Sequence, residues 1–128
     1  MRKKILIADD EKAIAEMLGV RLEENGYEVL TAYDGLETLA KARSEQPDLI
    51  LVDYTLSKLK GNEVSRRLKS DEACRHIPII LMSAYREEQI GDTSMADDFV
   101  GKPYEAEELL GKIKKWLAPK QGEIAHGG

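Results

Sequence analysis

Short apolar runs alternate along the chain with segments whose apolar residues recur at helical spacing. The runs predict five strands, over residues 5–8, 27–32, 49–52, 77–83 and 98–101. In the first periodic segment, the spacing i, i+3, i+4, i+8 predicts a helix with an apolar inner face formed by Ile14, Met17, Leu18 and Leu22. The dipeptide at residues 25–26, Asn-Gly, is expected to end this helix.

Capping residues and prolines mark the boundaries of the later helices. Asp34 is suited to cap a second helix, which must stop before Pro47 and carries the apolar residues Leu36, Leu39 and Ala40. Asn62 is predicted to cap a third helix whose inner face holds Val64 and Leu68. A last helix after Pro103 has inward positions at Leu109, Leu110, Ile113 and Leu117.

Uniformly apolar strands separated by amphipathic helices are typical of a parallel sheet covered on both faces. Each parallel connection needs a helix and passes right-handed, so the predicted fold class is α/β, a doubly wound parallel sheet of five strands. In such sheets the functional groups collect beyond the carboxyl ends of the strands, where the strand order reverses.

Composition and charge restrict the function without identifying it. The chain has 128 residues, 42% of them hydrophobic and 34% charged, which predicts one globular domain over residues 1–118 and a disordered tail over 119–128. A net charge of -5 with scattered basic residues disfavours direct nucleic-acid binding. The longest apolar runs are too short to span a bilayer, and acids follow the first one too soon for a signal peptide. We therefore expect no membrane association and a cytoplasmic location.

Five polar residues stand at the predicted carboxyl ends of four strands: Asp9, Asp10, Asp53, Ser83 and Lys102. Two carboxylates ~4 Å apart repel each other by about 4 kcal/mol at an effective dielectric near 20, so three of them on one edge call for a cation. Oxygen ligands favour Mg²⁺, which combines one or two carboxylates with water and phosphate oxygens. A lysine and a hydroxyl beside such a metal are suited to hold a phosphoryl group.

Four segments carry a resemblance to a known family. The blocks ILIADDE, LILVDYTLSKLKG, IPIILMSAY and DDFVGKPY resemble the signature blocks of the response-regulator receiver domain of two-component signalling, in the same order and at about the same spacing, over roughly residues 3–117. The resemblance implies a flavodoxin-like fold with strand order 2-1-3-4-5 and about five helices. It also implies a phosphoryl group taken from a histidine kinase or phosphotransfer protein onto Asp53, with Mg²⁺ required, and an unknown downstream protein target.

The resemblance also assigns roles to single residues. It implies that Asp10 binds Mg²⁺ directly, Asp9 acts mainly through water and the backbone carbonyl of Thr55 completes the metal site. Ser83 and Lys102 would contact the phosphoryl group. The bond before Pro103 would be cis, and Phe99 would change rotamer together with Ser83 on phosphorylation. Thr55 and Tyr85, each two residues beyond a site residue, flank the path of water to phosphorus and are expected to tune the rate of hydrolysis.

Two segments depart from the family pattern, the loop after Asp53 and the stretch between Ser83 and Lys102. Ser57 stands where receivers usually carry a proline, which removes a constraint on φ and predicts a looser loop after Asp53. Between Ser83 and Lys102 the chain is about two residues shorter than usual and contains Gly91, so the fourth helix is expected to be short or irregular.

Other functions remain as alternatives. A receiver-like protein-interaction module would keep the fold without taking up phosphate, but the complete set of polar residues argues against it. A haloacid-dehalogenase-like phosphatase would need a second aspartate at the position of Thr55. The chain is not expected to be an enzyme beyond Mg²⁺-dependent self-phosphorylation from phosphodonors and self-dephosphorylation. Two origins stay open: a receiver that acts alone, or one excised from a larger regulator or hybrid kinase.

Overall fold

The computed structural model describes residues 2–86, 89 and 95–119. In chain order its elements are β1 (Lys4–Ala8), α1 (Lys12–Glu24), β2 (Glu28–Ala32), α2 (Gly35–Glu45), β3 (Leu49–Asp53), α3 (Gly61–Lys69), β4 (Ile79–Ser83), β5 (Asp98–Gly101) and α4 (Ala106–Leu117). The strands form one parallel sheet in the order β2-β1-β3-β4-β5, as the family resemblance implies.

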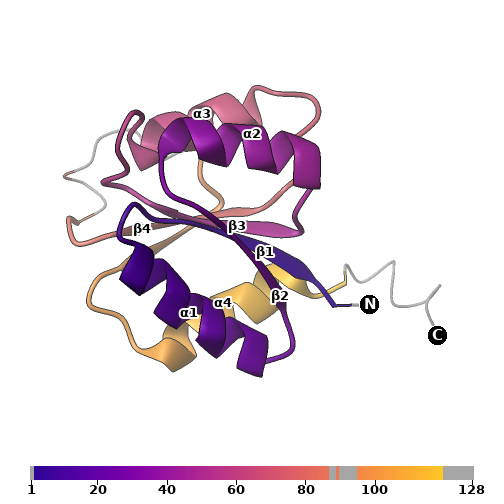
Figure 1. Cartoon of the computed structure of the whole chain (residues 1–128), viewed down its shortest axis with the longest axis vertical. Helices are drawn as coiled ribbons and strands as arrows, with labels where there is room; N and C mark the ends of the chain where they lie inside the picture. Colours follow the sequence, from indigo (N-terminus) through magenta and orange to yellow (C-terminus); the bar gives the residue numbers. More distant parts are fainter. Residues whose placement is uncertain (1, 87–88, 90–94, 120–128) are drawn as a thin grey trace.

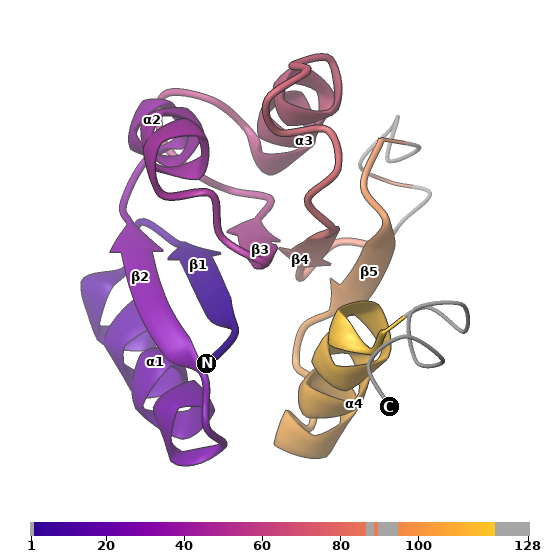
Figure 2. The same ribbon diagram turned by 90° about the vertical axis from the view of Figure 1, so that its right-hand side faces the viewer.

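The four helices of the described residues cover both faces of the sheet, α2 and α3 on one side and α1 and α4 on the other (Figure 1). Figure 2 shows α1 beside β1 and β2, and α4 beside β5. Alternate residues of each buried strand enter one of two apolar clusters. Leu6, Ile50 and Leu81 face α2 and α3, whereas Ile7 and Leu51 face the other helix pair. The predicted doubly wound α/β class is therefore correct.

The inner face of α1 differs from the predicted one. Leu22 is buried, but Ile14 and Met17 are 41% and 71% exposed, and the helix instead buries Ala15 and Gly19. A Cβ atom on Gly19 would lie 3.3 Å from Val29 Cγ1, so the helix lies too close to the sheet for large side chains there. The apolar period located the helix correctly and was right for Leu18 and Leu22, but Ile14 and Met17 lie outside the buried stripe.

The predicted caps were partly correct. Asp34 caps α2, since its carboxylate accepts a hydrogen bond from the Glu37 N–H at 2.8 Å. The predicted cap at Asn62 is wrong, because α3 begins at Gly61 with Lys60 in the capping position. Val64 and Leu68 are buried as expected.

The expected helix between Ser83 and Lys102 falls largely on residues 87–88 and 90–94, which lie outside the described residues. The helix labelled α4 is the last predicted one, Ala106–Leu117. The predicted tail likewise lies outside the described part of the chain from residue 120 onward. Among the described helices, none has the length and apolar character needed to cross a membrane.

Candidate functional site

The carboxyl ends of β1 and β3 bring three carboxylates together. Asp9 and Asp10 follow β1, Asp53 ends β3, and one oxygen atom from each lies within 4.8 Å of the others. Asp9 and Asp53 are buried, with 2% and 4% of their surfaces exposed, whereas Asp10 is exposed. The three carboxylates predicted to share one edge therefore do lie together, and the structure adds that they differ in burial.

Each carboxylate oxygen of Asp53 contacts another side chain. Lys102 Nζ lies 3.1 Å from Asp53 Oδ1 and 4.0 Å from Asp9 Oδ2. The Thr55 hydroxyl donates a hydrogen bond to Asp53 Oδ2 at 3.0 Å. Because β3 is buried along its whole length, the carboxylate projects from a rigid strand end in a fixed direction.

The electrostatics of the site follow from the burial of opposite charges. Desolvation of the Asp9 carboxyl raises its pKa above the ordinary value, which the Glu11 N–H hydrogen bond opposes and the neighbouring Asp53 reinforces. Burial tends to lower the pKa of Lys102, but the charge and hydrogen bond of Asp53 outweigh this and the pKa is raised. Lys102 therefore stays positively charged beside the carboxylates.

Ser83 ends β4 and is 1% exposed, and its Oγ accepts a hydrogen bond from the Tyr85 N–H at 2.9 Å. The bond between Lys102 and Pro103 is cis, the geometry that the resemblance implies. Phe99 is not part of the carboxylate cluster. It is half-buried in β5 and packs against the apolar cluster beneath α2 and α3.

The loop after Asp53 is anchored although it lacks the usual proline. The Ser57 carbonyl accepts hydrogen bonds from the N–H groups of Gly35 and Leu59, at 3.0 and 2.8 Å. Lys58 adopts φ of 69° and its ammonium lies 3.4 Å from the Asp34 carboxylate. These contacts tie the loop to the start of α2. They argue against the looser loop that the missing proline predicts.

Two tyrosines beside the site were not predicted from the sequence. Tyr104 follows Pro103, and burial raises the pKa of its hydroxyl, with Lys102 opposing and Asp9 and Asp53 adding to the shift. The ring of Tyr54, the residue after Asp53, meets that of Tyr85 edge to face, with the ring centroids 6.0 Å apart. In the sequence, the only sign that these two tyrosines lie near the site is their position directly after Pro103 and Asp53.

The donor set suits a hard divalent cation. All the clustered ligand atoms are carboxylate oxygens, which Mg²⁺ prefers, and the exposed Asp10 leaves one side open to water. The residues present therefore fit a magnesium site formed by Asp9, Asp10 and Asp53.

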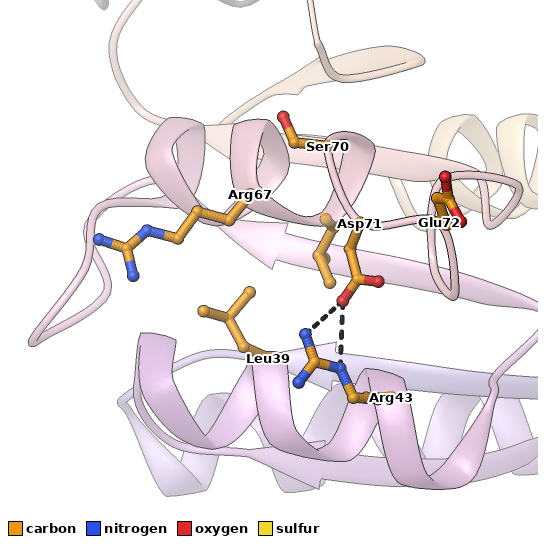
Figure 3. A pocket seen from close by; sticks show the side chains of 7 residues that line it. Leu39, Arg43, Arg67, Ser70, Asp71 and Glu72 are labelled. Atoms are coloured by element: carbon orange, nitrogen blue, oxygen red, sulfur yellow. Dashed lines mark hydrogen bonds and ion pairs between the residues drawn. The ribbon is translucent and has the colours of Figure 1, made fainter.

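A separate pocket of about 560 Å³ lies between α2 and the end of α3 (Figure 3). Among its charged lining residues, Arg43 Nε donates to Asp71 Oδ2 at 3.1 Å, and Arg67 Nε donates to Glu63 Oε2 at 2.9 Å. The first pair joins α2 to the turn after α3, and the second lies within α3. The pocket contains none of the candidate site residues.

Comparison with known proteins assigns a family to this architecture. The family model described as the response regulator receiver domain matches residues 5–114. The chain is 41% identical to the alkaline phosphatase synthesis transcriptional regulatory protein PhoP of Bacillus subtilis, over 98% of this chain and 52% of the relative. It is 43% identical to the phosphate regulon transcriptional regulatory protein PhoB of Pseudomonas aeruginosa, over 90% of this chain and 52% of the relative.

Among solved structures, the response regulator TrrA of Thermotoga maritima in complex with Mg²⁺ and BeF is similar with a TM-score of 0.82 and 37% identity, over 90% of this chain and 99% of that one. This chain spans about half the length of the two curated relatives. The match to the family model covers most of the chain. The four sequence blocks and the observed strand order agree with this family. The chain belongs to the response regulator receiver domain family.

Proposed function

We propose that this receiver domain accepts a phosphoryl group on Asp53 and passes on the signal by a change of its surface. The observation that supports this most strongly is the geometry of Asp53. Its carboxylate is 4% exposed, lies at a strand end and has Lys102 Nζ at 3.1 Å from one oxygen. A nucleophile fixed in this way is ready for in-line attack without first losing conformational freedom.

In the proposed reaction an Asp53 oxygen forms a bond to phosphorus while the bond from phosphorus to the donor breaks. The electron pair of that bond leaves with the donor, which takes up a proton, and the product is an aspartyl phosphate. We expect Lys102, beside Asp53, to offset negative charge on the transferred group, and the Ser83 hydroxyl, at the end of β4, to contact it. Mg²⁺ held by Asp9, Asp10 and Asp53, with the Thr55 carbonyl as a further ligand, would supply the remaining charge neutralisation.

The proposed switch couples Ser83 to Phe99. A phosphoryl group adds about 1.5 to 2 negative charges. If the Ser83 hydroxyl turns toward the new oxygens, it leaves the Tyr85 N–H that it now binds, and Phe99 can rotate inward. The proposed donor is a histidine kinase or phosphotransfer protein in the cytoplasm, and the proposed recipient is a protein target.

The relatives that are named transcriptional regulators are about twice as long as the segment that matches, so the expected absence of nucleic-acid contact concerns only the receiver domain.

The test is uptake of phosphate from a small donor. The protein is incubated with Mg²⁺ and phosphoramidate, and its intact mass is recorded. We expect one phosphoryl adduct that hydroxylamine removes, as it does acyl phosphates, and that is absent without Mg²⁺ and in Asp53→Asn. As a matched control, Asp71→Asn removes a carboxylate far from the cluster and should keep the adduct. An adduct that persists in Asp53→Asn would place the modification elsewhere, and no adduct in the wild type would favour an interaction module.

A further inference from the structure

Tyr54 is anchored through both its backbone and its ring. Its N–H donates to the Met82 carbonyl and its carbonyl accepts from the Gly61 N–H, both at 2.8 Å. The ring is half-buried against the apolar cluster beneath α2 and α3. Backbone and ring are therefore both held by the core of the domain.

Tyr85 is held less firmly and lies at the surface. Its ring is 53% exposed, and its described anchors are the hydrogen bond from its N–H to Ser83 Oγ and the edge-to-face contact with Tyr54, with an interplanar angle of 77°. Such a ring pair is favourable beyond the area it buries. Without its partner an exposed side chain would sample other rotamers.

The two rings lie beside Thr55, which contacts the proposed phosphoacceptor. Together with Thr55, Lys60 and Gln89 they line a pocket of about 220 Å³. Thr55 also donates a hydrogen bond to Asp53 Oδ2, so this pocket lies one side chain away from the carboxylate. A water molecule entering through the pocket would approach the phosphorus of an Asp53 phosphate.

We propose that Tyr54 is a positioning residue that holds the Tyr85 ring across this pocket and thereby slows hydrolysis of the phosphorylated state. The proposal rests on the proposed function of Asp53. In hydrolysis the water oxygen forms a bond to phosphorus, the bond between phosphorus and the Asp53 oxygen breaks, and the carboxylate leaves with the electron pair while the proton goes to solvent. Tyr54 does not touch the reacting atoms and acts through Tyr85.

The experiment measures phosphate loss in four variants of the full chain. Each protein is loaded with phosphoramidate and Mg²⁺, freed of the donor and followed by intact mass over time. Tyr54→Leu keeps apolar volume but loses the ring, and we expect loss of phosphate roughly three- to tenfold faster, as for Tyr85→Leu. The double variant should be no faster than Tyr85→Leu, because both changes remove the same barrier. Tyr54→Phe keeps the ring and should restore the wild-type rate.

Controls separate positioning from a general loss of stability. Tyr27→Leu removes a half-buried tyrosine at the opposite end of the sheet and should lower the melting temperature without changing the rate of phosphate loss. If Tyr54→Leu does not fold, Tyr54→Met tests the same point with an unbranched side chain.

An unchanged rate in Tyr54→Leu, or rates that multiply in the double variant, would overturn the inference and leave the function of Asp53 intact. Failure of the wild type to take up phosphate would overturn both.

Discussion

At the scale of single residues, the position of Asp53, the proposed phosphoacceptor, depends on a neighbour that has no side chain. The Gly61 N–H binds the Tyr54 carbonyl, and a Cβ atom at Gly61 would lie 2.6 Å from the Asp53 carbonyl oxygen and 2.8 Å from Leu81 Cδ1. Two of the three atoms that such a Cβ would meet belong to the backbone of Asp53 and Tyr54. The start of α3 can therefore lie against the end of β3 only while residue 61 is glycine.

Gly61→Ala is accordingly expected to destabilise the protein by about 1–3 kcal/mol, because the backbone that carries Asp53 has to move. Urea unfolding measures the loss, and the phosphoramidate reaction should slow as well. The control is Gly111→Ala in α4, where a Cβ atom would meet nothing within 4 Å. That variant should instead gain about 0.5–1 kcal/mol from helix propensity. Equal effects at the two positions would contradict the packing argument.

At the scale of elements, the edge strand β5 is joined to α4 through Asp98. Trp116 Nε1 donates to Asp98 Oδ2 at 2.8 Å, and Lys112 Nζ lies 3.0 Å from Oδ1. Burial opposes ionisation of Asp98, but the hydrogen bonds from Trp116, the Phe99 N–H and Lys112 outweigh it and lower the pKa of the carboxyl. A polar contact thus fixes the helix beside the strand that leads to Lys102.

Because its pKa is lowered in the folded state, ionised Asp98 stabilises the fold above the ordinary pKa of 3.8, and this contribution is lost as the pH falls through the lower folded value. Asp98→Asn should therefore cost about 1–2 kcal/mol at pH 7 and progressively less below the ordinary pKa. Urea unfolding, followed by the fluorescence of Trp116, the single tryptophan, measures the free energy of unfolding of both proteins at pH 7 and at lower pH. Glu107→Gln, an exposed change on α4, is the control. A difference that stays constant with pH would show that Asp98 acts through shape alone.

At the scale of the whole molecule, the site joins segments that are far apart in the chain. Asp9 follows β1, Asp53 ends β3 and Lys102 follows β5, and they meet because these strands are parallel. A cation bound there would connect segments that separate on unfolding. Binding to the native state alone stabilises that state by mass action.

With a dissociation constant on the order of 1 mM, ~10 mM Mg²⁺ would contribute roughly 1.4 kcal/mol, or a few degrees in melting temperature. Asp10→Asn should flatten this Mg²⁺ dependence by removing a ligand. It should raise the metal-free melting temperature only slightly, since Asp10 is exposed and its repulsion is screened. Thermal melts at matched ionic strength measure both effects. Glu11→Gln removes the same charge outside the cluster and should keep the full response; an equal gain from Mg²⁺ in Asp10→Asn would show that Asp10 is not a ligand.

The sequence by itself determined the fold class, the sites of the strands and the carboxylates at their ends. Short apolar runs and helical periods can be recognised within single segments of the chain, and parallel strands place their carboxyl ends on one edge whatever the details of packing. This is why Asp9, Asp10, Asp53, Ser83 and Lys102 could be assigned to one edge before any distance was known.

Only the tertiary structure decided how closely the elements pack and which side chains meet. The exposed Ile14 and Met17, the cap at Lys60 and the contact between Tyr54 and Tyr85 depend on distances between segments that no local pattern contains. The depth of each aspartate was decided in the same way. Desolvation, which raises the pKa of Asp9, is a property of everything that surrounds the carboxyl, and the folded chain alone sets it.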